Sequence, residues 1–283
     1  MDHSELRKLG QKVRMIVSDL DQTLLNSDAT LSPENLAAIR AAEAKGIFVT
    51  VCSGRIFSML EAYARILDIQ GPVITTNGAA IVDGKTGKLI SSHPIPKDAA
   101  VKILDYARER DYDYSALTAQ VSYFSCNSLR IKRFERYNEI AGAGGFEEMR
   151  LEYFDGRSYT GIDSDVLKML IYQIPEEDFA SLAAFLDSIP EISYTSSDEG
   201  LLDIMAAGTN KGTAVAEVRR SLGLEKDQVC VFGDYINDLA MFDEARLTVA
   251  MGNAHDELKS KALFVTDTND RAGVARALEA LIL

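Results

Sequence analysis

The chain has 283 residues, of which 47% are hydrophobic, which is enough for one large domain or two ordinary ones. Its formal net charge is −13, which argues against a general nucleic-acid-binding role. No apolar run reaches the roughly 18 residues that a membrane-spanning helix needs. We therefore expect a globular protein whose partners are neither nucleic acids nor membranes.

The cysteines and the N-terminus predict a cytoplasmic location. Cys52, Cys126 and Cys230 are scattered and show no pairing pattern, as is typical of reduced thiols in an intracellular protein. Residues 1–5 are polar and acidic and lack the profile of a signal peptide. A monomer and a homodimer are both compatible with this composition.

The first third of the chain alternates strands and helices. Ser32 is a suitable N-cap, Pro33 suits the first helical position, and Gly46 is a suitable end for the same helix. Strands are expected at 13–18, 47–52 and 73–76, and a second helix at 55–67. This rhythm predicts an α/β fold built on a doubly wound parallel sheet.

The pattern changes near residue 80 and predicts an inserted α+β domain with an antiparallel sheet. Two glycines between apolar pairs indicate a hairpin at 81–90. Helices are expected at 98–110, 129–141 and 176–188, strands at 112–114, 121–125 and 166–174, and a loop at 142–145.

The core pattern is expected to resume around Leu201. Helices are predicted at 211–222, 236–245 and 273–281, and strands at 228–232, 247–250 and 262–265. We therefore expect a discontinuous core domain of residues 1–84 and 196–283, with residues 85–195 as the inserted domain.

Four short motifs suggest one active site. They are Asp19-Leu20-Asp21-Gln22-Thr23, Ser53-Gly54-Arg55, Lys211-Gly212 and Gly233-Asp234-Tyr235-Ile236-Asn237-Asp238. Asp19 follows an apolar run that reads as a buried strand, so it would lie at the carboxyl edge of the sheet, where open α/β folds bind ligands. Asp21 is two residues further on and would point to the same side if the chain stays extended. Paired carboxylates with a hydroxyl, a lysine and a second acidic cluster suit phosphoryl transfer with a divalent metal.

This set of motifs resembles the haloacid dehalogenase (HAD) superfamily, specifically its Cof-type phosphatases. The motifs occur in the family's order, with its long gap between the second and the third. Flanking segments that also resemble the family are Thr76-Asn77-Gly78-Ala79, Gly200-Leu201-Leu202-Asp203-Ile204-Met205 and Val249-Ala250-Met251-Gly252-Asn253-Ala254. The resemblance implies a Rossmann-like HAD core and an inserted cap of the C2B type (subclass IIB) that carries the specificity contacts.

Two aspartates are expected to perform the chemistry. Asp19 is the candidate nucleophile, because a carboxylate can attack phosphorus to form an aspartyl phosphate. Asp21 is the candidate general acid and base for the leaving group and for the attacking water. Lys211 would donate to the phosphoryl group and to Asp19 and stabilise the transition state.

Mg²⁺ is the expected cofactor, since it prefers oxygen ligands and keeps several waters. The resemblance implies that it binds the Asp19 carboxylate, the Asp21 main-chain carbonyl and the Asp234 carboxylate. Asp238 would act behind these ligands, either holding a metal-bound water or orienting Lys211. Thr23 is expected to stabilise the loop after Asp19.

The second motif is expected to bind phosphate. The Ser53 hydroxyl and the Gly54 amide can both donate to a phosphoryl oxygen at a positive helix end, and glycine lets the backbone come close. Arg55 has two open interpretations, which are neutralising charge and bridging to the cap. Asn237 could donate to the phosphoryl group or to the leaving oxygen.

Three further features leave alternatives open. The family usually has glycine where this chain has Gln22, which could alter the loop or face the substrate. Tyr235 could line the pocket or pack in the core. A basic cluster on a cap helix is usually a solvated face but could hold a phosphorylated substrate; it consists of Arg130, Lys132, Arg133 and Arg136.

The sequence thus predicts a Mg²⁺-dependent phosphatase for small phosphate monoesters, with sugar phosphates ahead of pyridoxal phosphate and flavin mononucleotide. A phosphotransferase or mutase, as in the related phosphomannomutases, would use the same intermediate. A non-catalytic sugar-phosphate-binding regulator is the alternative from another class. Dehalogenation is disfavoured, because it needs neither Asp21 nor the acidic fourth motif.

Overall fold

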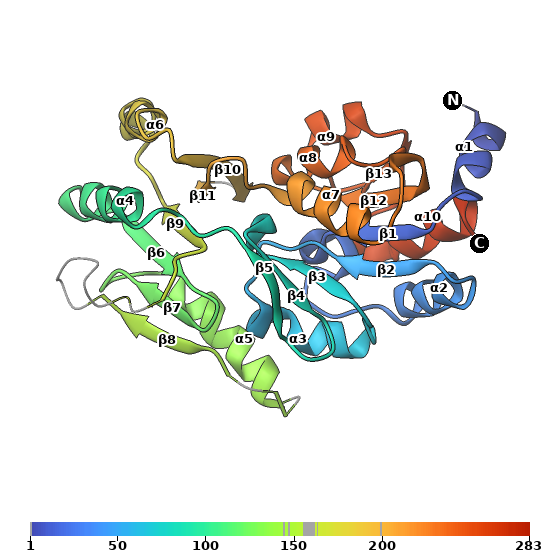
Figure 1. Cartoon of the computed structure of the whole chain (residues 1–283), viewed down its shortest axis with the longest axis horizontal. Helices are drawn as coiled ribbons and strands as arrows, with labels where there is room; N and C mark the ends of the chain where they lie inside the picture. The colour runs from blue at the N-terminus through green and yellow to red at the C-terminus, as the bar shows by residue number, and fades with distance from the viewer. Residues whose placement is uncertain (1, 144, 147, 155–161, 163, 199) are drawn as a thin grey trace.

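The computed structural model describes residues 2–143, 145–146, 148–154, 162, 164–198 and 200–283, and shows two lobes (Figure 1). One lobe holds both termini and a five-stranded parallel sheet. The other is built on a six-stranded sheet, and a three-stranded sheet lies between them. No described helix has the length and apolarity that crossing a membrane requires.

The parallel sheet has the strand order β14-β13-β12-β1-β2. Its strands are β1 (Met15–Ser18), β2 (Phe48–Val51), β12 (Val229–Gly233), β13 (Leu247–Ala250) and β14 (Phe264–Val265). Ser18 at the end of β1 lies beside Val51 and Phe232. The segments that follow β1, β2 and β12 therefore leave the sheet at one edge, which brings the first, second and fourth motifs together.

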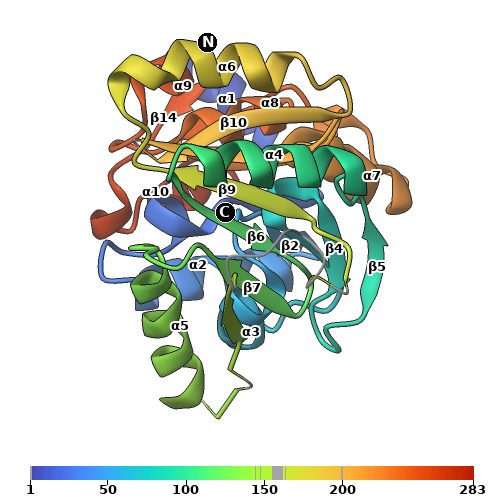
Figure 2. The same cartoon turned by 90° about the vertical axis from the view of Figure 1, so that its left-hand side faces the viewer.

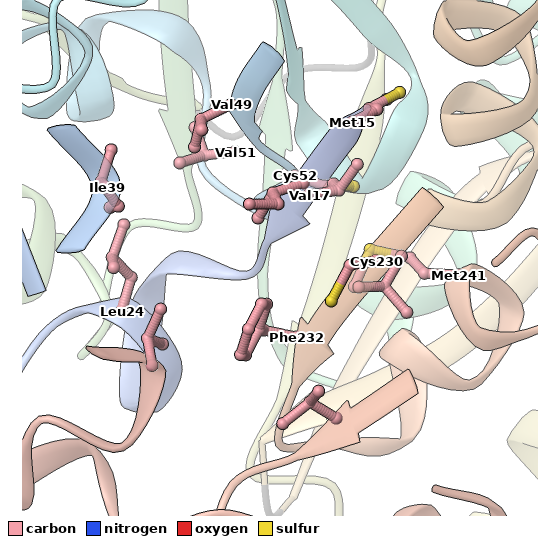
Figure 3. Packing of buried hydrophobic residues seen from close by; sticks show 14 of the residues in the cluster. Met15, Val17, Leu24, Ile39, Val49, Val51, Cys52, Cys230, Phe232 and Met241 are labelled. Carbon is pink, nitrogen blue, oxygen red and sulfur yellow. The ribbon is translucent and has the colours of Figure 1, made fainter. Parts of the chain in front are cut away.

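Helices cover this sheet, and its central strands are buried along their whole length. The helices are α1 (His3–Gly10), α2 (Pro33–Ala44), α3 (Phe57–Ile66), α7 (Lys211–Ser221), α8 (Leu239–Phe242), α9 (Asp256–Lys261) and α10 (Gly273–Leu281). Figure 3 shows the apolar packing around β1, including Met15, Val17 and Phe232. Continuous apolar strands of this kind are typical of a parallel sheet covered on both faces.

The expected start and end of α2 are confirmed. The Ser32 hydroxyl accepts a hydrogen bond from the amide of Asn35 at 3.0 Å, and Pro33 is the first helical residue. Gly46 follows the helix with a φ of +78°, a left-handed conformation that glycine adopts without strain.

The three-stranded sheet corrects one expectation. It contains β3 (Pro72–Thr75), β4 (Ala80–Asp83) and β5 (Leu89–Ser92), all antiparallel, and β4 with β5 forms the predicted hairpin. The third strand was expected to belong to the parallel sheet, but among the described residues β3 has a single bridge to it, from Ile74 to Cys52. The reason is the turn at Thr76 and Asn77, whose positive φ angles reverse the chain at once, so that β4 pairs back on β3.

The cap sheet has the order β10-β11-β9-β6-β7-β8 and is antiparallel except for the pair β7 and β8. Its strands are β6 (Asp113–Leu117), β7 (Val121–Phe124), β8 (Arg150–Tyr153), β9 (Lys168–Tyr172), β10 (Ile192–Asp198) and β11 (Leu201–Ala206), and its helices are α4 (Lys97–Glu109), α5 (Ile131–Ala143) and α6 (Phe179–Asp187). The predicted α+β insertion agrees with this arrangement. Of the predicted loop at 142–145, residues 142 and 143 still belong to α5, and residue 144 lies outside the described residues.

The sequence pattern suggested that the core resumes around Leu201, but in the structure it does not. β11 pairs with β9 and β10 in the cap sheet. Its largely apolar sequence does not distinguish it from a buried strand of the core. The predicted boundaries at 84/85 and 195/196 fall inside the β4–β5 hairpin and inside β10. We propose that the domain boundaries lie after β5 and after β11. The elements α1, β8, α9 and β10 were not predicted.

The two faces of the cap sheet have different coverings. Figure 2 looks onto the outer face, where α4 and α6 lie. Side chains such as Met169, Ile171 and Ile204 pack on that side. The opposite face, with Leu117 and Leu170, packs against α5 and against α3 of the core, so it is turned toward the end of β1.

Candidate active site

Lys211 joins the first, third and fourth motifs. It is the first residue of α7 and is buried, and its Nζ lies 2.9 Å from Asp19 Oδ1 and 2.6 Å from Asp238 Oδ1. The other oxygen of Asp238 accepts hydrogen bonds from the amides of Asp234 and Tyr235, at 2.9 and 3.2 Å. Both oxygens of Asp238 are therefore occupied, and the carboxylate fixes Lys211 and the fourth motif relative to each other.

Burial and charge set the protonation of this group. Burial raises the pKa of Asp19 to about 7, although Lys211 opposes the shift. Burial also raises the pKa of Asp234 well above its usual value, and the neighbouring Asp19 and Asp238 add to the effect. Burial alone would lower the pKa of Lys211, but the carboxylates of Asp19 and Asp238 raise it well above its usual value.

The fourth motif provides a candidate cation site. Carboxylate oxygens of Asp19, Asp234 and Asp238 lie within 4.8 Å of one another. Asp238 is already engaged, and Asp234 Oδ1 accepts a hydrogen bond from Thr23 Oγ1 at 2.6 Å. Close carboxylates that raise one another's pKa values are an arrangement that a divalent cation stabilises. The donor set therefore fits a hard cation held by Asp19 and Asp234, with Thr23 and Asp238 behind them.

Arg55 contacts both the candidate acid and the cap. Its Nε and Nη2 donate to the two carboxylate oxygens of Asp21 at 2.8 and 2.5 Å. Burial acts against ionisation of Asp21, but the Arg55 guanidinium holds the pKa of that carboxyl below its usual value. The guanidinium also lies 4.1 Å from the ring centre of Tyr137 on α5 and 5.1 Å from that of Tyr63 on α3. Arg55 thus contacts the cap through Tyr137 and a carboxylate of the site through Asp21, while its role in neutralising charge stays a prediction.

The second motif is packed tightly below the cap. Ser53 is buried, and its hydroxyl accepts a hydrogen bond from the amide of Arg55 at 3.2 Å. A Cβ on Gly54 would lie 3.0 Å from Oδ1 of Asn77, so a larger residue would crowd this site. Asn77 also accepts a hydrogen bond from Asn237 Nδ2 at 3.2 Å. Asn77 was not predicted as a site residue, although it lies in a segment that resembles the family.

The cap completes the cavity above Asp19 and Lys211. Arg130 and Arg133 line this cavity, Arg136 lines the adjoining one, and Arg133 Nη2 lies 3.9 Å from Asp21 Oδ1. Three members of the basic cluster therefore border the site. The other polar cap residues of the same cavity were not predicted from the sequence; they are Tyr137, Lys168, Ser197 and Asp203.

Tyr235 and Cys52 have different environments. Tyr235 is half-buried, lines the adjoining cavity and packs edge-on against His255.

Cys52 is buried beside the site, and burial raises the pKa of its thiol well above its usual value. A buried thiol of this kind is unreactive toward oxidants.

Gln22 adopts a left-handed conformation, with a φ of +57°. The strain of such a conformation in a non-glycine residue is about 1–2 kcal/mol, partly offset by the greater entropy of an unfolded glycine. We therefore predict that Gln22→Gly raises the free energy of unfolding by about 0.5–1 kcal/mol without loss of activity. Urea denaturation and an activity assay measure both effects. A destabilised variant would show that the contact of the Gln22 side chain with Asn269 matters more than the strain.

Comparisons with known proteins agree with this geometry. The family of haloacid dehalogenase-like hydrolases matches residues 16–278, so the chain belongs to that family. Two phosphatases of Bacillus subtilis, both named for 5-amino-6-(5-phospho-D-ribitylamino)uracil, are similar to the chain. The first is 31% identical, and the match covers 95% of this chain and 98% of the relative. The second is 30% identical, and the match covers 96% of this chain and 96% of the relative.

Solved structures show the same fold. A haloacid dehalogenase-like hydrolase from B. subtilis has a TM-score of 0.83 and 28% identity, covering 95% of this chain and 100% of its own. A subclass IIB sugar phosphatase has a TM-score of 0.77 at 23% identity, and the match covers 94% of this chain and 98% of that protein. The predicted membership in the Cof-type HAD phosphatases and the predicted fold class are confirmed, and the chain is a phosphatase.

Proposed function

We propose that this phosphatase hydrolyses small phosphate monoesters through an aspartyl phosphate on Asp19, with Mg²⁺ as cofactor. The observation that carries the proposal is the buried group of Asp19, Lys211 and Asp234 at the end of β1, with Asp21 beside it. The free cysteines of the described chain are consistent with a cytoplasmic enzyme.

Two displacements at phosphorus account for the residues. In the first, an oxygen of Asp19 bonds to phosphorus, the ester P–O bond breaks, and Asp21 gives a proton to the leaving alkoxide. In the second, Asp21 takes a proton from water as the water oxygen bonds to phosphorus, and the bond to Asp19 breaks to release inorganic phosphate. Because Arg55 stabilises ionised Asp21, that ion pair has to loosen before Asp21 can carry the proton of the first step.

Mg²⁺ bound by the carboxylates of Asp19 and Asp234 and by the main-chain carbonyl of Asp21 would offset the repulsion between the nucleophile and a phosphate dianion. Lys211, which contacts Asp19 directly, would donate to the phosphoryl oxygens in the same region. Ser53, Gly54 and Asn237 would hold the remaining phosphoryl oxygens.

We predict that the affinity for Mg²⁺ falls as the pH drops below about 7. Asp19, with a pKa of about 7, and Asp234, with a raised pKa, must lose their protons before the cation binds. Below its pKa, each carboxyl weakens binding about tenfold per pH unit. Calorimetric titration of the protein with Mg²⁺ across this range, in buffers of different ionisation enthalpy, measures both affinity and proton release. Affinity that does not change with pH, without proton release, would contradict the prediction.

Sugar or sugar-alcohol phosphates are the substrates that we favour. Two relatives at 31% and 30% identity are named for a phosphoribitylamino compound, which supports this class. The basic side chains of Arg130 and Arg133 in the cavity suit a polar, anionic substrate.

Product analysis on a substrate panel tests the proposal. The panel contains sugar phosphates, 5-amino-6-(5-phospho-D-ribitylamino)uracil, pyridoxal phosphate and flavin mononucleotide. Release of inorganic phosphate is the expected result. Formation of an isomeric sugar phosphate would indicate a phosphotransferase or mutase, and binding without turnover would indicate the regulator.

A further inference from the structure

Lys168 lies outside the four motifs, yet its ammonium group connects the cap to the second motif. Lys168 is the first residue of the cap strand β9, whereas Gly54 follows β2 of the core. Lys168 Nζ donates to the carbonyl oxygen of Gly54 at 2.7 Å and lies 2.7 Å from Asp203 Oδ1. One side chain therefore spans the interface between the two lobes at the edge of the catalytic cavity.

The strand register of the cap sheet places Lys168 and Asp203 on the face of the sheet that is turned to the site. Lys168 lies opposite Leu117, and Asp203 lies opposite Leu170. Because alternate residues of a strand share a face, Lys168, Leu170 and Asp203 are on the face turned to the core. They line the same cavity as Asp19 and Lys211, so the pair belongs to the site and not to the outer layer of the cap.

Cap stability alone explains this pair poorly. Lys168 is 4% exposed and Asp203 is fully buried, and their neighbours on this face include Leu117, Leu170 and Leu201. The desolvation of two buried charges is large enough that apolar residues of similar size are often as stabilising or more so. Asp203 is also fixed by a short hydrogen bond from the Ser197 hydroxyl. The arrangement therefore holds a lysine at a fixed place beside the leucines of this face.

Lys168 and Asn77 lie next to Gly54. A Cβ at this position would lie 3.4 Å from Lys168 Nζ and 3.0 Å from Asn77 Oδ1. Without a side chain of its own, Gly54 depends on its neighbours for its orientation, and Lys168 and Asn77 are those neighbours. A charge-assisted hydrogen bond to its carbonyl restricts how the peptides on either side can rotate.

We propose that Lys168 is a positioning residue of the phosphatase: as the cap closes, its ammonium group, held by Asp203, docks on the Gly54 carbonyl and fixes the phosphate-binding backbone. The proposal rests on the proposed function, since it takes Ser53 and Gly54 as the phosphate-binding segment. It implies that cap closure and phosphate binding are coupled, because opening the cap breaks the bond to Gly54. The effect of Lys168 should be the same for every phosphate ester, since the phosphoryl group is common to all.

The test compares Lys168→Met with Lys102→Met, a matched change of an exposed lysine on the outer helix α4. kcat and KM are measured for a sugar phosphate and for p-nitrophenyl phosphate, and the affinity for inorganic phosphate is measured by calorimetry. We expect Lys168→Met to lower kcat/KM by about 10- to 100-fold, by the same factor for both esters. Inorganic phosphate should bind more weakly to this variant, whereas Lys102→Met should match the wild type.

Asp203→Asn is the second variant, because it keeps the side-chain shape and removes only the charge that holds Lys168. A smaller loss, again equal for both esters, is expected. Unchanged kcat/KM and phosphate affinity in both variants would overturn the proposal. So would a loss confined to one ester, which would mean a leaving-group contact, or a loss that follows a lowered melting temperature. If the wild type releases no phosphate from any ester, the proposed function fails, while the phosphate-binding comparison still tests the role of Lys168.

Discussion

Asp19→Asn is expected to lower the rate of phosphate release by at least about 10⁴-fold while leaving the protein folded. Asparagine has nearly the shape of aspartate, but its amide cannot form the bond to phosphorus. Asp19 lies at the end of β1 with its carboxylate 2.9 Å from Lys211, so no other described carboxylate has the same position. Phosphate release under saturating substrate measures the effect.

The same substitution has a separate effect on the metal-free protein. Burial and nearby carboxylates raise the pKa of Asp19 to about 7, so its negative charge is unfavourable there. Removing the charge should leave the free energy of unfolding in EDTA unchanged or increased. Asp68→Asn, at an exposed carboxylate that lines neither cavity of the site, is the matched control and should keep full activity. Activity that survives in Asp19→Asn would exclude Asp19 as the nucleophile.

Lys211→Met is expected to reduce both stability and activity. Its ammonium group lies between the buried carboxylates of Asp19 and Asp238, and its removal leaves them without a cation. Breaking a buried ion pair in this way destabilises a protein by about 3–5 kcal/mol. Loss of a donor to the transition state should lower kcat by about 10²–10³-fold. Urea denaturation in EDTA and steady-state kinetics measure the two effects.

The destabilisation by Lys211→Met should depend on pH and on metal. It should be smaller below pH 7, because Asp19, whose pKa burial raises to about 7, can then take up a proton. Added Mg²⁺ should stabilise the variant more than the wild type, since a cation would replace the missing charge. Lys261→Met, at an exposed lysine of α9, is the control. A Lys211→Met protein as stable as the wild type would contradict the account of the buried cluster.

The core and the motifs could be predicted because their signals are local. The strands that precede Asp19, Ser53 and Asp234 are short apolar runs, and parallel strands end at one edge of their sheet. Once the sheet is parallel, the first, second and fourth motifs must meet, and α7 brings Lys211 to them.

The cap residues could not be predicted because their positions depend on strand register. β11 is largely apolar, like the strands of the core, so its place in the cap sheet was missed. A lone lysine in the sequence is usually a surface residue, and nothing near Lys168 shows that Asp203 is its partner. The pairing of β9 with β11 joins residues far apart in the chain, which a local pattern does not specify.

Arg55 and Gln22 could be predicted only in part. The sequence identified both as residues of interest but left the contacts open. For Arg55, the tertiary structure supplies Asp21 and Tyr137 at the same time. For Gln22, the backbone conformation is the left-handed one that a glycine would favour, and the side chain accepts a hydrogen bond from Asn269.

Phosphate release from the substrate panel, measured with Mg²⁺ and again after EDTA for the wild type and for Asp19→Asn, tests the central claim most directly. The account predicts release that requires the metal and disappears in the variant. Release that persists in Asp19→Asn, or that is indifferent to EDTA, would contradict it.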